Sequence, residues 1–305
     1  MSDFGIIGIG RIGTSMARNM SSKGIIVSLY DKSQNSLDNL KSDYPELESS
    51  LVFNDIYKFI SSISKPRKVL VLVPSGPALD EVISLLMQHL ESNDILIDGG
   101  NTNPNVSFEN HQTIKSKNLL YLGMGVSGGV KGVLEGPSIM IGGDTNAFDQ
   151  VKNIFTQITS KTINGSKSFE FFGDSNQGHF VKMIHNGIEY VEMQLISSIY
   201  YLMINSKKYM YDDVAKIFKK WNDIDLNSYL LEISLLKLNE KTDDSYLLDK
   251  IDDKADDNGT GRWMLKHAID LGCSVTMLNS AIDSRFISND NNTRSKANKL
   301  SLIHI

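Results

Sequence analysis

Cysteine is nearly absent from this 305-residue chain, whose single example is Cys273. One cysteine cannot form a disulfide within the chain, and this favours a reducing compartment such as the cytoplasm. Because Cys273 follows a glycine in an apolar stretch, burial statistics predict a small core residue rather than a nucleophile. The chain also lacks a cluster of metal ligands, so we expect no metal site.

Long apolar runs and an excess of basic charge are absent as well. No run approaches the roughly 18–20 apolar residues of a membrane span. The chain passes from Met1-Ser2-Asp3 directly into an apolar strand, without the basic and long apolar segments of a signal peptide. The net charge of -5 argues against a nucleic-acid partner, which requires a basic surface. We therefore expect a soluble cytoplasmic protein with neither a nucleic-acid nor a membrane partner.

What the chain does contain is an ordinary globular composition, with 41% hydrophobic and 22% charged residues, at a length that favours two domains. Apolar runs that predict buried strands alternate with stretches of helical periodicity up to about residue 173. This alternation is typical of a mostly parallel, doubly wound α/β sheet. The predicted strands are 4–8, 25–30, 69–73, 95–97, 119–122, 138–142 and 169–172, and the predicted helices are 14–22, 76–90, 104–115 and 146–159.

From Gly173 to Ser288 the pattern is helical, with little β alternation. We therefore predict a Rossmann-type dinucleotide-binding domain over 1–175 and an all-helical substrate and dimerisation domain over 176–305. The polar tail after Asn289 is expected to be loose, although 297–305 would allow a short helix.

A glycine-rich loop, Gly8-Ile9-Gly10-Arg11-Ile12-Gly13, follows the first strand and opens a helix. In this motif the first glycine permits a tight turn, the second lets a pyrophosphate approach the backbone, and the third lets the helix pack closely. Asp31 ends the second strand about 20 residues downstream, as in dinucleotide-binding folds. The alternative is a glycine turn in an α/β protein that binds no nucleotide.

The choice of cofactor depends on Asp31. A carboxylate there accepts hydrogen bonds from ribose hydroxyls and repels a 2′-phosphate, which favours NAD. Lys32, the next residue, weakens that repulsion and leaves NADP possible. The predicted cofactor-binding residues are Gly8, Ile9, Gly10, Arg11, Ile12, Gly13, Asp31, Lys32, Val73, Pro74 and Asn101.

Residues 178–190 form the segment richest in chemically active side chains. In a helix, Lys182, His185, Asn186 and Glu189 share one face over two turns. A solvent-facing polar stripe is the alternative interpretation. The His-Asn pair counts against it, as does Gly187, because a helical glycine costs about 1 kcal/mol and suggests that another segment packs closely there.

Two further glycine-rich segments, 98–102 and 123–129, follow predicted strands. We expect them as loops at the carboxyl edge of the sheet, where open α/β folds bind ligands. Asn101 and Ser127 are able to hydrogen-bond a sugar acid, and the glycines let the backbone approach it. Either segment taken alone is also compatible with a plain turn.

Together these motifs resemble the 6-phosphogluconate dehydrogenase family. The resemblance runs in collinear order from about residue 4 to 288, and the length is similar to the short form of the family, which lacks a second helical repeat. It is carried by Asp-Gly-Gly-Asn (98–101), Gly-Val-Ser-Gly-Gly (125–129), Gly-Pro-Ser (136–138), the run over 178–190, Trp221-Asn222, Ser-Tyr-Leu-Leu-Glu-Ile (228–233) and Gly-Thr-Gly-Arg-Trp (259–263).

The resemblance implies oxidative decarboxylation of 6-phospho-D-gluconate to ribulose 5-phosphate and CO2, with reduction of NAD(P). Lys182 then takes the 3-hydroxyl proton and later protonates the carbonyl oxygen as CO2 leaves, and Glu189 protonates C1 of the enediol. To act as a base the amine must be uncharged, which requires burial or nearby positive charge. The implied ligands of the carboxylate and hydroxyls are Asn101, Ser127, Gly128, Gly129, His185 and Asn186, and those of the phosphate are Tyr190, Thr260 and Arg285.

The sequence departs from the family pattern around the phosphate. Asn258 stands where the family usually has lysine, and the acidic run 252–257 adds negative charge nearby. The family's C-terminal Arg-x-x-Phe-Gly-x-His stretch is not recognisable, and His304 lies in a different context. Each lost charge-assisted contact is worth about 1.5–3 kcal/mol. Arg262 or Lys266 is a candidate to compensate.

Three functional hypotheses follow. The first is the decarboxylating dehydrogenase, and the second is a related β-hydroxyacid dehydrogenase that acts on a non-phosphorylated sugar acid. The third is a cofactor-binding paralogue with little turnover, against which the presence of Lys182 and Glu189 argues. We also expect a homodimer or homotetramer, from the resemblance and because a helical array of this size leaves an apolar face to cover.

Overall fold

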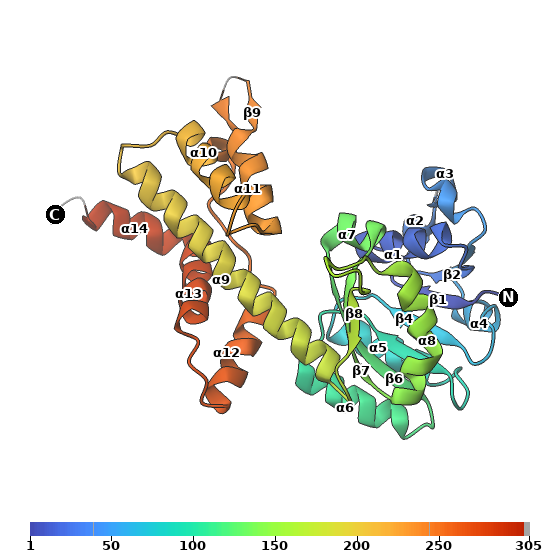
Figure 1. Cartoon of the computed structure of the whole chain (residues 1–305). Coiled ribbons are helices and arrows are strands. Elements are labelled where there is room, and N and C mark those ends of the chain that lie inside the picture. The colour runs from blue at the N-terminus through green and yellow to red at the C-terminus, as the bar shows by residue number, and fades with distance from the viewer. Residues whose placement is uncertain (39, 244, 302–305) are drawn as a thin grey trace. The chain divides into compact units, whose positions relative to one another are not determined.

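The computed structural model describes residues 1–38, 40–243 and 245–301 of the chain. It divides into two compact units, Met1–Met183 and Ile184–Ile305 (Figure 1). The first unit contains an eight-stranded sheet with helices on both faces, and the second is built of helices with one short hairpin. The predicted fold class, a doubly wound sheet followed by a helical domain, is confirmed.

The sheet has the order β3-β2-β1-β4-β5-β6-β7-β8. All neighbouring strands are parallel except β6 and β7, which pair antiparallel. The strands are β1 (Phe4–Ile7), β2 (Val27–Tyr30), β3 (Leu51–Phe53), β4 (Lys68–Val71), β5 (Ile95–Asp98), β6 (Leu120–Ser127), β7 (Ser138–Gly143) and β8 (Phe169–Phe171). The carboxyl ends of the six strands β1 to β6 therefore lie along one edge, as the site predictions require, and β7 and β8 run in the opposite direction.

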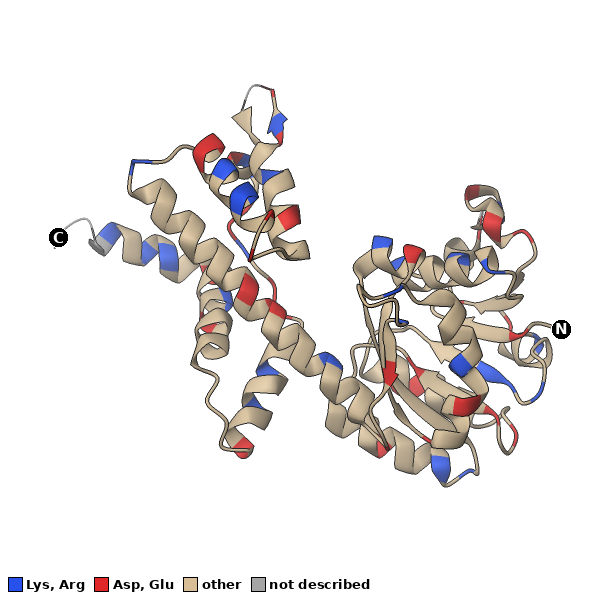
Figure 2. Ribbon diagram, viewed as in Figure 1, with Lys and Arg blue, Asp and Glu red and all other residues tan. Residues whose placement is uncertain are grey.

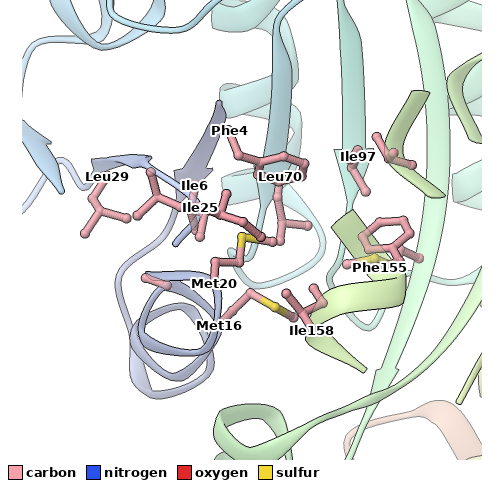
Figure 3. Close-up of a cluster of buried hydrophobic side chains, with 14 of the residues drawn as sticks. Phe4, Ile6, Met16, Met20, Ile25, Leu29, Leu70, Ile97, Phe155 and Ile158 are labelled. Carbon is pink, nitrogen blue, oxygen red and sulfur yellow. The ribbon is translucent and has the colours of Figure 1, made fainter. Parts of the chain in front are cut away.

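Alternation along the strands builds a core on each face of the sheet. Phe4 and Ile6 of β1 enter one hydrophobic cluster, whereas Ile7 enters the other. Strands covered on both faces have few exposed positions, which explains their nearly continuous apolar sequences. In Figure 3 Met16 and Met20 from the first helix lie near Ile6 and Leu70, with Phe155 and Ile158 from a later helix beside them.

Helices cover both faces of this sheet. Longer ones alternate with strands as predicted, and five short helical segments of three to seven residues lie among them. Their bounds are α1 (Arg11–Ser22), α2 (Gln34–Leu37), α3 (Leu40–Asp43), η1 (Pro45–Leu47), α4 (Ile56–Ser61), α5 (Pro77–Leu86), α6 (Pro104–Lys115), α7 (Gly129–Glu135) and α8 (Thr145–Ile158).

The boundary between the units falls within the long helix α9 (Gln177–Asn205). Two small clusters of buried apolar residues form the core of the second unit. No helix in the described ranges combines the length and apolarity needed to cross a membrane. The remaining elements are α10 (Tyr211–Asn222), α11 (Tyr229–Asn239), β9 (Lys241–Thr242), β10 (Ser245–Tyr246), η2 (Leu247–Lys250), α12 (Thr260–Asp270), α13 (Thr276–Asn289) and α14 (Asn291–Ser301).

Three sequence expectations are wrong in detail. Cys273 is exposed rather than a core residue, because it follows the turn at Leu271 and Gly272 that ends α12. The tail after Asn289 is not loose, since α14 begins at Asn291. The segment 123–129 is not a loop for most of its length, because β6 continues to Ser127. His304 lies outside the described residues.

Candidate active site

The glycine loop has the geometry that its motif predicts. Gly8 adopts φ +90°, a conformation that favours glycine, and Gly13 packs so closely that an added Cβ would lie 2.0 Å from the Gly8 carbonyl oxygen. An added Cβ at Gly10 would meet nothing within 4 Å, so the space for a ligand at this point is open. Arg11 begins α1, whose N-terminus is suited to an anion.

Beside this loop lies a pocket of about 220 Å³. Its lining includes five of the residues predicted to bind the cofactor, and apolar side chains fill most of the rest. The lining residues are Ile7, Gly8, Tyr30, Asp31, Lys32, Leu72, Val73, Pro74, Ala78, Glu81, Val82 and Leu85. An apolar slot with a carboxylate at its rim fits the adenine and ribose of a dinucleotide.

Asp31 is held in place at the rim of this pocket. One carboxylate oxygen accepts a hydrogen bond from the Ile9 N–H at 2.9 Å, and the other accepts from the Ser33 N–H at 2.8 Å. Lys32, which was expected to offset this charge, lies 3.3 Å from a Glu81 carboxylate oxygen. The three charged side chains at the rim therefore carry a net negative charge.

The segment 98–102 is a turn built around a buried carboxylate. Asp98 is fully buried at the end of β5 and accepts hydrogen bonds from the Gly100 N–H at 3.0 Å and the Thr102 hydroxyl at 2.8 Å. This arrangement leaves Asn101 exposed at the carboxyl edge of the sheet. The plain-turn alternative does not explain why a carboxylate is buried here, because burial of a charge is costly unless it is hydrogen-bonded.

The glycines of β6 make room for the first turns of α9. A Cβ added at Gly123 would lie 2.8 Å from His179 Nδ1, and one added at Gly125 would lie 2.3 Å from the Lys182 Cβ. Lys182 is consequently buried, with only 8% of its surface exposed. We expected these glycines to admit a ligand, whereas Gly123 and Gly125 admit side chains of the helix.

Ser127, Gly128 and Gly129 lie at the end of β6 and the start of α7. Ser127 is half-buried, and both glycines are exposed with positive φ, +126° and +59°. An added Cβ at Gly129 would meet nothing within 4 Å, so this turn is open to a ligand. The first unit thus presents Asn101, Ser127 and the two glycines at the ends of strands that lie along one edge.

In the second unit α9 carries the rest of the predicted polar face. His185 Nδ1 lies 3.4 Å from a Glu189 carboxylate oxygen and 3.3 Å from Asn186 Oδ1. Asn186 is buried, so a fully solvated stripe is excluded. Gly187 packs against Met264, whose Sδ would lie 2.0 Å from an added Cβ, in agreement with the predicted close approach. The structure describes α9 throughout, and its charged residues are Lys182, Glu189 and Glu192 (Figure 2).

Tyr190 is the centre of a polar cluster in the second unit. Its hydroxyl donates to Asn258 Oδ1 at 3.0 Å and lies 3.3 Å from Asp257 Oδ1. Arg285 stacks on the Tyr190 ring, with the guanidinium carbon 3.9 Å from the ring centroid. The Thr260 hydroxyl donates to the same Asn258 oxygen at 2.8 Å. Three residues predicted to bind phosphate thus lie together.

This cluster already contains a carboxylate. The side chain of Asp257 is only 8% exposed, and its Oδ2 lies 2.6 Å from Arg262 Nε. Arg262, a candidate to replace the missing lysine charge, is therefore paired with Asp257. Burial is the main cause that raises the pKa of Tyr190, and the charge of Asp257 adds to it. The acidic run 252–257 is visible in the sequence, whereas this contact depends on the fold.

Family models match almost the whole chain. Residues 3–166 match the NAD binding domain of 6-phosphogluconate dehydrogenase, and residues 178–303 match the 6-phosphogluconate dehydrogenase C-terminal domain. The chain belongs to the 6-phosphogluconate dehydrogenase family. The chain is 38% identical to decarboxylating 6-phosphogluconate dehydrogenase of Staphylococcus epidermidis over 97% of its own length and 63% of the relative's. The corresponding Saccharomyces cerevisiae protein is 38% identical over 98% of this chain and 61% of its own.

Solved structures agree with this assignment. The chain matches Plasmodium falciparum 6-phosphogluconate dehydrogenase with a TM-score of 0.92 and 37% identity, over 97% of this chain and 64% of that one. That enzyme is described in complex with its cofactor NADP+ and with its substrate 6-phosphogluconate. A 3-hydroxyisobutyrate dehydrogenase of Mycobacterium tuberculosis, at 16% identity and a TM-score of 0.71, shares the fold. The chain spans less than two thirds of the length of its 6-phosphogluconate dehydrogenase relatives.

Proposed function

We propose that this protein catalyses the oxidative decarboxylation of 6-phospho-D-gluconate to ribulose 5-phosphate and CO2, with reduction of a nicotinamide dinucleotide. The observation that carries the proposal is the burial of Lys182 against Gly125 in a chain that belongs to this family. Burial disfavours the charged form of an amine, which is the condition for a lysine to accept a proton. Membership of the family adds the substrate class.

In this proposal Lys182 and Glu189 move the protons. Lys182 Nζ takes the proton of the 3-hydroxyl and returns a proton to the carbonyl oxygen when CO2 leaves. Glu189 then delivers a proton to C1. A dinucleotide held at the glycine loop would supply the acceptor for the hydride that leaves C3. The proposed ligands of the carboxylate and hydroxyls of the sugar acid are Asn101, Ser127, Gly128, Gly129, His185 and Asn186. Tyr190, Thr260 and Arg285 hold the phosphate.

We further propose that NAD is preferred over NADP, although the Plasmodium falciparum relative is described with NADP+. The support is Asp31, whose two oxygens are fixed by backbone N–H groups at the rim of the pocket. A 2′-phosphate there would meet this fixed carboxylate, and the neighbouring Lys32 is already close to Glu81. The residues that would hold the dinucleotide are the glycine loop, Asp31, Lys32, Val73, Pro74 and Asn101.

The contact between Tyr190 and Asp257 favours a second candidate function. A carboxylate 3.3 Å from the Tyr190 hydroxyl, with asparagine at 258, suits a substrate whose far end is a hydroxyl better than one that ends in a phosphate. The same reaction on a non-phosphorylated sugar acid would need no cation at this point. The third hypothesis, a binding protein with little turnover, predicts that Lys182→Ala changes nothing measurable in a turnover assay.

The deciding assay mixes the purified protein with 6-phosphogluconate or gluconate, each with NAD and then NADP. Absorbance of the reduced nicotinamide and release of CO2 are followed together. Equal amounts of both products from 6-phosphogluconate, lost in Lys182→Ala, are expected. Reduction with gluconate alone would favour the second function. No reduction with either acid, by a protein that binds NAD, would contradict both.

We also propose that the chain forms a homodimer or homotetramer through its helical unit. Exposed large apolar side chains are frequent there, and Ile188, Leu202, Leu236 and Ile269 are each more than half exposed. Light scattering at micromolar concentration is expected to give at least twice the mass of one chain, and a monomeric mass would contradict the proposal. The cytoplasmic location suggested by the sequence stays a prediction.

A further inference from the structure

A connected series of buried polar side chains, here called the path, lies next to the turn that carries Asn101. The proposed reaction makes no use of these side chains. The path begins at Asp98, whose carboxylate holds the turn through Gly100 and Thr102. The Tyr121 hydroxyl lies 3.4 Å from the same Asp98 oxygen that Thr102 contacts. Tyr121 and Asp98 are each fully buried on neighbouring strands, β6 and β5.

The path continues to α9, the helix that carries the proposed base Lys182. Ser107 Oγ, from α6, lies 3.0 Å from the Tyr121 hydroxyl and 2.8 Å from His179 Nδ1. His179 is 2% exposed, and its Nε2 lies 4.0 Å from an Asp98 carboxylate oxygen. Four side chains from four elements thus form one buried path from the Asn101 turn to α9.

His179 stands three residues before Lys182, less than one helical turn away. Both side chains are seated at glycines of β6, His179 at Gly123 and Lys182 at Gly125. The two contacts are two residues apart on the strand, so a slide of α9 along β6 would displace both together. Gly178 tightens the fit, because an added Cβ would lie 2.2 Å from the Gly123 carbonyl oxygen.

The energetics favour one register. Buried polar atoms are costly unless they are hydrogen-bonded, so a slide that separated His179 from Ser107 would leave groups of the path unpaired. Burial lowers the pKa of His179, and the charge of Asp98 opposes this in part. At neutral pH the imidazole therefore acts as an uncharged hydrogen-bonding group.

We propose that His179 is a positioning residue: through Ser107, Tyr121 and Asp98 it fixes α9 on β6 and so holds Lys182 in register with the turn that carries Asn101. The proposal rests on the proposed function for the role of Lys182. His179 touches neither substrate nor cofactor in this proposal. Its effect is on the placement of the amine, and a misplacement of about 1 Å can cost about a hundredfold in rate.

The chain offers a matched control in a second buried histidine, His111. It is 5% exposed and stacks on Tyr121 with 5.4 Å between ring centroids. Its Nε2 lies 3.2 Å from Asp144 Oδ1, so its polar contact is with a residue outside the path. His179→Leu removes the path's terminal hydrogen bond with little change in volume, and His111→Leu removes a histidine of similar burial outside the path. His179→Asn retains a polar atom near the position of Nδ1.

The assay compares steady-state rates with 6-phosphogluconate and with its C3-deuterated form. We expect His179→Leu to lower kcat about tenfold or more, to leave the KM for the dinucleotide within about twofold, and to raise the isotope effect on kcat. His179→Asn is expected to recover part of kcat, and Tyr121→Phe to resemble His179→Leu in a milder form. His111→Leu is expected to lower the melting temperature and leave the isotope effect unchanged.

A purely structural role gives a different pattern. If His179 had only a structural role, the substitutions would act by lowering the folded fraction. Both histidine variants would then lose kcat in proportion to their loss of stability, and both would keep wild-type isotope effects. That result, or a wild-type kcat in His179→Leu, would overturn the proposal.

A second measurement separates this proposal from the proposed function. Formaldehyde and borohydride methylate lysine amines, and peptide mass spectrometry gives the rate at each lysine without any turnover. We expect His179→Leu to change the methylation rate of Lys182 severalfold relative to Lys152 on α8, and His111→Leu to leave that ratio unchanged. If wild-type protein does not oxidise 6-phosphogluconate, the proposed function fails. The methylation ratio still decides the positioning role, and an equal ratio in all variants would refute it.

Discussion

Within each of the two units, the predicted site residues are held in place by different kinds of contact. In the first unit several glycines approach backbone atoms closely, in addition to the contacts of Gly123 and Gly125 with side chains of α9. An added Cβ would lie 2.0 Å from the Gly8 carbonyl oxygen at Gly13, 2.2 Å from the Gly123 carbonyl oxygen at Gly178, and 2.5 Å from the Gly178 nitrogen at Gly142. Backbone atoms of strands and helices cannot move without moving their element.

In the second unit the close approaches are to side chains. An added Cβ would lie 2.0 Å from Met264 Sδ at Gly187, and 2.7 Å from the Tyr190 ring at Gly261. A side chain is able to change its rotamer, and methionine does so more readily than most. The first unit therefore tolerates little change where α9 begins on β6, whereas the second has room to alter what it binds. Asn258, one of the departures from the family pattern, lies in the second unit.

The largest effect is expected for Gly178→Ala. The new methyl group would collide with the Gly123 carbonyl oxygen and with the Met140 carbonyl oxygen at 2.7 Å, so the first turn of α9 must shift. We expect a loss of about 3 kcal/mol in the free energy of unfolding and about a hundredfold fall in kcat. Denaturant titration and steady-state kinetics measure the two effects.

Gly132→Ala on α7 is the control, because an added Cβ there meets nothing within 4 Å. It is expected to be neutral or slightly stabilising, since alanine is the better helix former. A wild-type kcat and wild-type stability in Gly178→Ala would mean that the backbone of the first unit adjusts to the methyl group. The first unit would then be no less tolerant of change than the second.

A smaller effect, in the opposite direction, is expected for Asn258→Lys. The side chain at 258 is exposed at the edge of the Tyr190 cluster, so a longer cation fits without displacing backbone. One charge-assisted contact to phosphate is worth about 1.5–3 kcal/mol, which corresponds to a fall of about tenfold or more in the KM for 6-phosphogluconate.

Asn258→Gln supplies length without charge and is expected to leave that KM near its wild-type value. Equal KM values for Asn258→Lys and Asn258→Gln would show that the charge at 258 does not reach the phosphate. Asp257 would then be the residue to change next, because it already pairs with Arg262.

Much of the first unit was predictable because its strands are buried on both faces. Seven of the eight strands were expected, and the helix predicted over 104–115 has the bounds of α6. The strand β3 and the short helical segments α2, α3, η1, α4 and α7 were missed, because three to seven residues are too few to show a periodicity. A strand rich in glycine, such as the end of β6, has the composition of a loop.

The purpose of the glycines in β6 could not be predicted, because it depends on a helix more than 50 residues away. The same holds for His179: the sequence placed it within the motif but offered no partner for it. Gly187 was predictable, since a helical glycine has a cost that calls for an explanation. The contact of Tyr190 with Asp257 required the fold, because the two residues are 67 positions apart.

The pH dependence of stability is expected to differ between variants of the first unit. Burial lowers the pKa of His179 below its usual 6.5, so the unfolded chain binds this proton more readily than the folded chain. The contribution of the uncharged His179 side chain to the free energy of unfolding is therefore fully present above pH 6.5. It is lost as the pH falls below that value. Urea unfolding at pH 7.5 and 5.5 is expected to show a larger decrease for the wild type than for His179→Leu. An equal decrease in both would assign the acid sensitivity to other groups.

The smallest effect is expected for Gly187→Ala, the counterpart of Gly178→Ala in the second unit on the same helix. The added methyl group meets Met264, whose thioether is able to rotate away, and alanine gains about 1 kcal/mol of helix propensity. We therefore expect a change in the free energy of unfolding of less than about 1 kcal/mol, measured by the same denaturant titration. Met264→Ala in the same background gives the methyl group space, and the pair separates crowding from propensity. If Gly187→Ala is as damaging as Gly178→Ala, and Met264→Ala does not relieve it, side-chain contacts are as unyielding as backbone contacts in this protein, and the distinction between the two units is lost.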